Sequence, residues 1–173
     1  SEGSRWIAQA VTTRPLPKDL WRHQAEAIHA WEAHGRRGLL SMATGSGKTR
    51  TALAAAERCP GLRLLVIAAP RAGLVEQWRD ELAAHAQLHR PVLAYERADR
   101  WQESLFARMR AVRKGSNETV VVIGTLHSLA GRRFETVLED SGHEGRSLLI
   151  VDEVHNAGSP TFRDVLRPAF DWR

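Results

Sequence analysis

The sequence contains a single cysteine, Cys59, among its 173 residues. One cysteine excludes an internal disulfide framework and is compatible with a reducing cytoplasm, so we expect a cytoplasmic protein with a structural thiol. No run of about 18 or more apolar residues is present, so no membrane span is predicted. The first residues have neither the apolar core of a signal peptide nor the character of a transit peptide. With 43% hydrophobic and 26% charged residues, the chain fits one soluble globular domain.

Lysine is scarce as well. Three of the 25 basic residues are lysines, which leaves 22 arginines, and the formal net charge is +5. A basic domain is compatible with a polyanionic partner such as nucleic acid. The arginines are nevertheless scattered among many alanines, which is as typical of a compositional bias as of a binding patch. Charge alone is therefore weak support for such a partner.

The order of apolar runs predicts the fold class. Continuous runs at 64–68, 120–123 and 148–151, with a shorter one at 92–95, are typical of strands buried on both faces. Segments with helical character lie at 21–33, 73–87, 101–113 and 132–139. This alternation predicts an α/β fold, with a mostly parallel sheet covered by helices on both faces. Residues 1–19, which contain Pro15 and Pro17, are expected to be a lead-in or linker, and residues 20–173 one lobe.

A glycine-rich stretch, SMATGSGKTRTALAAA at 41–56, predicts a phosphate-binding loop. A short apolar run at 38–42 predicts a buried strand before it, and an alanine-rich segment at 49–58 predicts a helix after it. Such a turn directs backbone N–H groups and a helix N-terminus at one anion. Gly45 and Gly47 allow positive φ or a close approach of the phosphates. Lys48 would contact the β- and γ-phosphates of ATP, and the Thr49 hydroxyl would bind Mg²⁺. The alternative is a Gly/Ser turn that happens to contain Lys and Thr.

A pair of acids follows the last apolar run. Asp152 and Glu153 come directly after 148–151, so a buried strand would deliver both to the carboxyl edge of the sheet. Asp152 would hold the Mg²⁺ that Thr49 also contacts, and Glu153 would polarise the attacking water as general base. Acidic turns after strands are common, but this one follows a phosphate loop about a hundred residues upstream. The two patterns together predict an ATP-hydrolysing site.

These two motifs carry a resemblance to a known family. The segment 43–49, ATGSGKT, and the segment 152–155, DEVH, resemble motifs I and II of the superfamily 2 helicases and translocases, the DEAD/DEAH-box relatives. In that superfamily the first glycine of the P-loop is often replaced, so Met42 in that place is no defect. The resemblance implies a RecA-like lobe that binds ATP through Thr44, Ser46 and the loop residues above. It also implies that His155 links the ATP site to later motifs.

The resemblance extends from residue 20 to about residue 155. LWRHQ at 20–24 resembles the adenine-reading motif, which implies that Gln24 hydrogen-bonds the adenine edge. The family often has arginine where Trp21 stands, so a stacking role and a core role both stay open for Trp21. The segments 69–78 and 124–129 resemble loops that hold the nucleic-acid backbone, which assigns Arg71, Thr125 and Ser128 to phosphate contacts. For Leu74 and Trp78 we expect helix packing instead.

The segments LVEQW and DEVH resemble those of DNA-translocating, restriction-type members of the family. The partner that this resemblance implies is double-stranded DNA. We also expect the sequence to be the first lobe of a larger enzyme whose second RecA-like lobe supplies an arginine finger. Residues 1–173 alone are then expected to hydrolyse ATP barely above background. Three alternatives stay open: an RNA helicase lobe, an ATP-sensing module that binds nucleic acid without turnover, and a P-loop ATPase unrelated to nucleic acid.

Overall fold

The computed structural model describes residues 15–86, 90–95, 97–141, 145–153, 160–165 and 170–173. The described strands are β1 (Leu64–Ala69), β2 (Val92–Ala94), β3 (Val120–Thr125) and β4 (Ser147–Val151). The described helices are α1 (Arg22–Ala33), α2 (Lys48–Glu57), α3 (Ala72–His85), α4 (Ala98–Arg113), α5 (Leu126–Ala130), α6 (Arg132–Ser141) and α7 (Pro160–Val165). Each helix and strand predicted after residue 48 is present within a few residues of its predicted place. Helices α5 and α7 are additional to the predicted elements.

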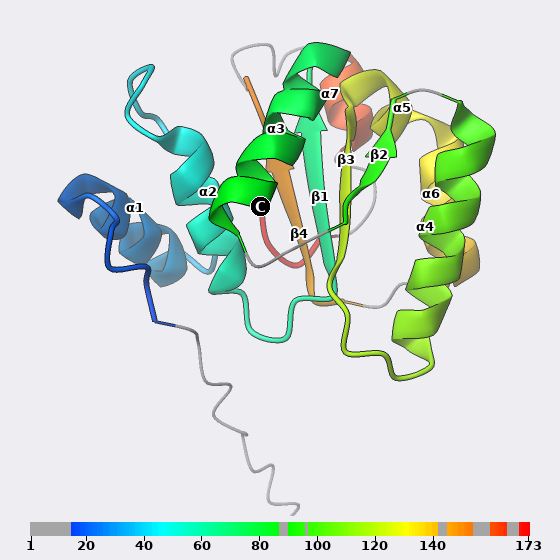
Figure 1. Ribbon diagram of the computed structural model, residues 1–173, viewed down its shortest axis with the longest axis horizontal. Coiled ribbons are helices and arrows are strands. Elements are labelled where there is room, and N and C mark those ends of the chain that lie inside the picture. Colours follow the sequence, from blue (N-terminus) through cyan, green and yellow to red (C-terminus); the bar gives the residue numbers. More distant parts are fainter. Residues whose placement is uncertain (1–14, 87–89, 96, 142–144, 154–159, 166–169) are drawn as a thin grey trace, which may run out of the picture.

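The four strands form one parallel sheet in the order β2-β3-β1-β4 (Figure 1). All six residues of β1 are buried, because this strand lies between β3 and β4 and has helices on both of its faces. Burial on both faces explains why the strands are continuous apolar runs without alternation. The predicted α/β architecture is confirmed.

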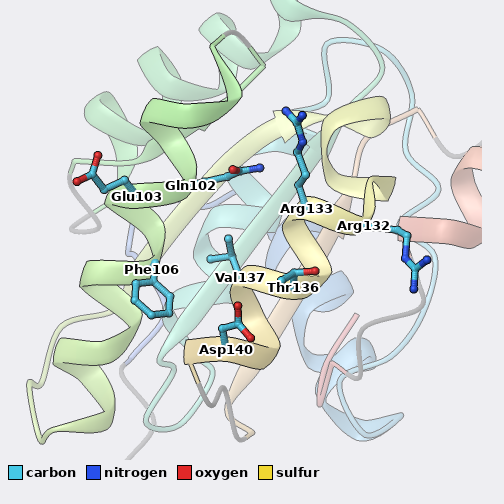
Figure 2. Close-up of a pocket in the computed structure, with 8 residues that line it drawn as sticks. All are labelled: Gln102, Glu103, Phe106, Arg132, Arg133, Thr136, Val137 and Asp140. Atoms are coloured by element: carbon cyan, nitrogen blue, oxygen red, sulfur yellow. The ribbon is translucent and has the colours of Figure 1, made fainter.

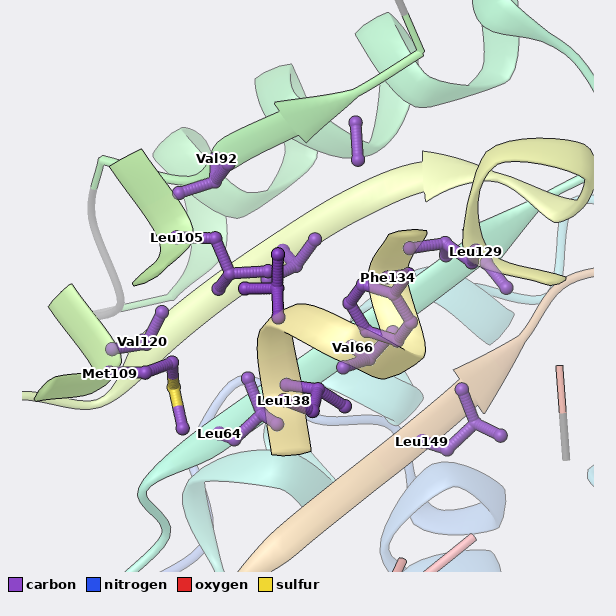
Figure 3. Close-up of a cluster of buried hydrophobic side chains, with 14 of the residues drawn as sticks. Leu64, Val66, Val92, Leu105, Met109, Val120, Leu129, Phe134, Leu138 and Leu149 are labelled. Atoms are coloured by element: carbon purple, nitrogen blue, oxygen red, sulfur yellow. The ribbon is translucent and has the colours of Figure 1, made fainter. Parts of the chain in front are cut away.

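Two hydrophobic cores lie on opposite faces of this sheet. Helices α2 and α3 pack on the face that contains Leu65 and Ile67. Helices α4 and α6 pack on the face that contains Leu64 and Val66, the cluster drawn in Figure 3. Successive residues of β1 therefore enter different cores, as the pleat of a strand requires. Within the described part of the chain, no helix has the length and apolar character needed to cross a membrane.

The strand predicted at 38–42, ahead of the phosphate loop, is wrong. These residues have no strand structure, and Leu39 is 71% exposed. Pairing here stops at Gly38, whose N–H donates to the Arg173 carbonyl at 2.9 Å. Trp172 pairs in parallel with Leu148 of β4, so residues 171–173 lie between β4 and the segment 36–38. Beyond Gly38 the segment lacks a paired neighbour among the described residues, and an apolar run alone does not make a strand.

Candidate functional site

The predicted phosphate loop, residues 43–49, lies at the N-terminus of α2. Gly47 is the N-cap of this helix with φ of 79°, and Gly45 has φ of 78°, both in the left-handed region that favours glycine. Residues 58–63 join the end of α2 to the start of β1, so α2 runs antiparallel to the strand. The loop is consequently at the carboxyl end of the sheet (Figure 1, the cyan loop above α2).

Three carbonyl groups of the loop accept hydrogen bonds from other groups of the protein. The Ser46 N–H and hydroxyl both donate to the Ala43 carbonyl, at 3.2 and 2.6 Å. His23 Nε2 donates to the Ser46 carbonyl at 3.2 Å, and Gln24 Nε2 donates to the Gly47 carbonyl at 3.2 Å. The first N–H groups of a helix have no partner within the helix, so those of α2 are left for an anion. The geometry of the loop is compatible with the predicted binding of nucleotide phosphates, and Lys48 is exposed beside it.

Gln24 connects α1 to the phosphate loop. Its side chain is 3% exposed, and its Oε1 accepts the Trp21 N–H at 2.9 Å while its Nε2 reaches the loop carbonyls. Both ends of the amide are thus bonded within the protein, and its contact with adenine stays a prediction. Trp21 is 58% exposed, so the core role is wrong, and the stacking role stays a prediction.

A carboxylate–guanidinium pair holds α1 against α2. Arg58 donates from Nε and Nη2 to the two oxygens of Glu32, at 2.8 and 2.7 Å. The Glu32 side chain is 14% exposed, so this pair is shielded from solvent. The hydrogen bonds from Arg58 hold the pKa of Glu32 below its usual value, against the opposing effect of burial. The pair therefore fixes the helix that carries Gln24 relative to the helix that begins at the phosphate loop.

The close packing of Gln24 on Gly47 predicts an unequal cost for two alanine substitutions. A Cβ on Gly47 would lie 2.3 Å from Gln24 Nε2, whereas a Cβ on Gly45 would meet nothing within 4 Å. Both substitutions force alanine into the left-handed region, at about 1–2 kcal/mol. Gly47→Ala must also displace Gln24, and overpacking adds about 1–3 kcal/mol. We expect urea unfolding to show a clearly lower free energy for Gly47→Ala than for Gly45→Ala.

The matched pair separates backbone strain from the Gln24 contact, because the two glycines differ in φ by only one degree. A Gln24→Ala background should remove most of the difference between the two variants, since it removes the obstructing amide. Equal destabilisation by the two substitutions in the parent chain would mean that Gln24 does not pack on Gly47.

The two acids lie at the carboxyl end of β4, as predicted. The Asp152 N–H donates to the Ala68 carbonyl at 2.8 Å, so β1 holds its backbone. Its Oδ1 accepts the Glu153 N–H at 2.9 Å, and its Oδ2 accepts the indole N–H of Trp78 at 2.9 Å. Glu153 is exposed and has φ of 55°, a rare conformation for a residue with a side chain. Strained residues of this kind cluster at active sites.

Sheet register brings the predicted nucleic-acid residues to the same edge. Thr125 is paired with Ala69 at the end of β1, and Asp152 extends the ladder on the other side of that strand. Arg71, which is exposed, follows two residues after Ala69 as the N-cap of α3. Thr125 Oγ1 accepts the Ser128 N–H at 3.2 Å and caps α5. The phosphate contacts assigned to Arg71, Thr125 and Ser128 stay predictions.

His155 lies outside the described residues. Trp78, for which we expected helix packing, is 4% exposed in the core between α3 and the sheet, which confirms that expectation. Its hydrogen bond to Asp152 joins residues 74 positions apart in the chain and has no signal in the sequence.

Other features of the described residues are separate from this site. An open depression of about 480 Å³ between α4 and α6, lined by Phe106, Arg133 and Asp140 among others, contains none of the predicted site residues (Figure 2). Burial raises the pKa of the Cys59 thiol to about 12, so this thiol is not a nucleophile at neutral pH. The carboxyl edge of the sheet is accordingly where the chemistry-bearing residues gather.

The chain is similar to known proteins in sequence and in fold. Residues 18–170 match the family described as type III restriction enzyme, res subunit. The fold is similar to the structure of a nuclease-deletion mutant of the Type ISP restriction-modification enzyme LlaGI in complex with a DNA substrate mimic, with a TM-score of 0.65 and 20% sequence identity. That match covers 86% of this chain and 16% of the LlaGI chain. No curated protein sequence matches the chain.

Proposed function

We propose that this chain, which belongs to the type III restriction enzyme res subunit family, is the ATP-binding lobe of a DNA motor. The family match over residues 18–170 spans most of the sequence. The family is a restriction-type branch of the superfamily 2 helicase-like lobes. The proposed role of the chain is to couple ATP hydrolysis to movement along double-stranded DNA. The observation that carries this proposal is that two motifs lie at the same end of the sheet. The phosphate loop at the start of α2 and the acids after β4 both lie at the carboxyl end of the parallel strands.

The residues at this edge have distinct proposed roles. The N–H groups at the start of α2, with Thr44 and Ser46 of the loop, hold the phosphates. Lys48 adds a positive charge toward the β- and γ-phosphates. Asp152 and the Thr49 hydroxyl would hold Mg²⁺, which when bound neutralises charge that develops on the phosphates.

Glu153 accepts a proton from the attacking water in this proposal. Its position one residue beyond Asp152, with its backbone in the left-handed region, places its side chain on the exposed side of the strand end. A carboxylate acting as general base must lie within hydrogen-bond reach of the water that it activates. The conformation of Glu153 is compatible with that task, because its exposed side chain is accessible to water.

Nucleic acid is proposed to bind at the neighbouring strand ends. Arg71, Thr125 and Ser128 come from the ends of β1 and β3, which are adjacent strands. We propose that they contact the sugar-phosphate backbone, because basic, hydroxyl and N–H groups make such contacts without reading sequence. A second RecA-like lobe in the full-length protein is proposed to close over the nucleotide and to contribute an arginine finger.

The experiment that tests this function is ATP turnover by the full-length protein, measured with double-stranded DNA, single-stranded DNA or RNA. We expect double-stranded DNA to stimulate turnover most. Arg71→Ala should weaken that stimulation for every DNA sequence and reduce its salt dependence, because a phosphate contact releases counterions on binding. Arg100→Ala, at an exposed position of α4, is the control with the same charge change.

The outcomes separate the alternatives. Stimulation by RNA alone would identify an RNA helicase lobe. Nucleotide binding without turnover, with any of the three polymers, would identify an ATP-sensing module. Turnover that no polymer changes would identify an ATPase unrelated to nucleic acid. Each of these three results contradicts the proposal of a DNA motor.

A further inference from the structure

The carboxylate of Asp152 is held by an indole from another element. Trp78 lies on the face of α3 that contains Val75 and Leu82, and all three side chains are buried against the sheet. Its Nε1–H donates to Asp152 Oδ2 at 2.9 Å. Buried tryptophan usually finds a partner for its N–H, and here the partner is an acid. Bonds from an N–H to a carboxylate are among the stronger hydrogen bonds in proteins.

Among the described contacts of Asp152, the hydrogen bond from Trp78 is the one that a side chain of another element makes to its carboxylate. Its backbone N–H is held by the Ala68 carbonyl, and its Oδ1 by the N–H of the next residue, Glu153. Both of these contacts are made by backbone groups at the strand ends. The contact from Trp78 is made by a rigid side chain packed in a core, so rotation of the carboxylate breaks it.

The remaining capacity of the carboxylate is suited to a metal. An ionised carboxylate has about four acceptor positions on its two oxygens, and two of these are occupied by N–H groups. Among the described residues these are its two side-chain partners, so the other positions are left for Mg²⁺ or a water in its shell. Groups that hold a metal ligand from behind fix its orientation, and their loss typically lowers metal affinity about 10–100-fold.

We propose that Trp78 is a positioning residue of the Mg²⁺·ATP site, and that its indole N–H fixes the Asp152 carboxylate for the metal. This inference rests on the proposed function, because it assigns the metal to Asp152. It gives a core residue of α3 a role in metal binding, although Trp78 itself does not touch the nucleotide. The role belongs to the N–H donor and not to the packing volume of the ring.

The test replaces the donor and keeps an aromatic ring. Trp78→Phe removes the N–H, and Trp101→Phe is the matched control, because Trp101 is also buried, at 6% exposure, but packs beside Phe134 in the opposite core. Binding of ATPγS by the full-length protein is measured by calorimetry as Mg²⁺ is titrated. Trp78→Phe should raise the half-saturating Mg²⁺ concentration about tenfold or more. Trp101→Phe should change it less than twofold, and Mg²⁺-free nucleotide affinity should stay the same in both variants.

A second measurement observes the contact directly, without nucleotide. In protein containing ¹⁵N-labelled tryptophan, the Trp78 indole resonance is identified by its loss in Trp78→Phe. Asp152→Ala should shift this resonance and speed its hydrogen exchange, whereas Asp140→Ala, at an exposed position of α6, should leave it unchanged. Mg²⁺ with ATPγS should shift it as well.

The results separate the proposed function from the role of Trp78. A wild-type protein that binds no nucleotide would overturn the proposed function. A wild-type protein with Mg²⁺-dependent binding, in which Trp78→Phe and Trp101→Phe have the same Mg²⁺ requirement, would overturn the role of Trp78 alone. A lower Mg²⁺ requirement in Trp78→Phe would also overturn it, because the indole would then restrain the carboxylate from the metal. A Trp78 resonance that does not change in Asp152→Ala would show that the indole does not contact this carboxylate, and the role proposed for Trp78 would be rejected.

Discussion

Replacing Glu153 with glutamine is expected to abolish most ATP hydrolysis by the full-length protein while ATP and Mg²⁺ still bind. Glutamine keeps the size of the side chain but cannot accept the proton of the attacking water. General base catalysis contributes about 10²–10⁴-fold, so kcat should fall by that factor. Asp152 is unchanged in this variant, and its N–H bond from residue 153 is made by the backbone. Turnover in the presence of DNA and calorimetric binding of Mg²⁺·ATPγS are the two measurements.

Two comparison variants isolate the chemical role of this residue. Glu139→Gln, at an exposed position of α6, makes the same change elsewhere and should leave kcat unaltered. Glu153→Gly removes the carboxyl group as well, but it relieves the positive φ of 55°. It should therefore be inactive and unfold at no lower urea concentration than the parent. Wild-type turnover in Glu153→Gln would show that another group accepts the proton.

The strained backbone at Glu153 is consistent with its proposed role in the site. A glycine there would adopt φ of 55° at little cost, whereas glutamate adopts it only because surrounding contacts enforce it. Those contacts include the strand ladder, which continues to the Asp152 N–H beside Ala68. The strain and the acid occur at the same residue, which is expected where function and stability conflict.

The sheet and its helices could be predicted from the sequence because strong local patterns specify them. The runs at 64–68 and 120–123 are continuous and apolar, and their neighbours in the chain have helical character. Strands of this kind are stable only when both faces are covered, so the alternation already predicts a layered fold. The positions of the 43–49 loop and of the two acids could be predicted for the same reason, since each is a short motif attached to one element, and their roles stay predictions.

Residues 38–42 show where local pattern fails. Their apolar character predicts a buried strand, but a strand also needs hydrogen-bonded neighbours along its length. The neighbour that they have is formed by residues 171–173, more than 130 positions later in the chain, and it pairs only as far as Gly38. Leu39 is consequently left exposed, and Leu40 and Met42 are half-buried. A contact between such distant segments has no local signature in a single sequence.

The contacts that support the site were unpredictable for a related reason. Trp78 and Asp152 meet because α3 packs over the end of β1, and Gln24 meets Gly47 because α1 packs beside α2. Each contact depends on how two elements pack, and residue identity alone does not specify that arrangement. The sequence predicted a core role for Trp78 and an adenine contact for Gln24, but neither of these hydrogen bonds.

Replacing Lys48 with alanine is expected to impair both nucleotide binding and turnover. Lys48 is the first residue of α2 and is exposed at the loop, so its ammonium group can reach the β- and γ-phosphates of ATP. A hydrogen bond to a charged group contributes about 1.5–3 kcal/mol, which corresponds to about 10–150-fold weaker ATP binding on its loss. Charge also develops on the phosphate oxygens during transfer, and loss of one stabilising donor lowers kcat by about 10²–10³-fold.

The chain offers a matched control for this variant, because it has only two other lysines, Lys18 and Lys114. Lys114 follows the last residue of α4 and is exposed, so Lys114→Ala makes the same change in net charge away from the phosphate loop. If the general basicity of the chain attracts ATP, both variants should lose affinity equally. If the phosphate loop binds it, only Lys48→Ala should. Unchanged calorimetric affinity for ATP in Lys48→Ala would reject the phosphate-loop assignment, whatever the DNA dependence of turnover. Lys48 is the one charged side chain of the motif, so a loop that binds the phosphates must lose affinity when this side chain is removed.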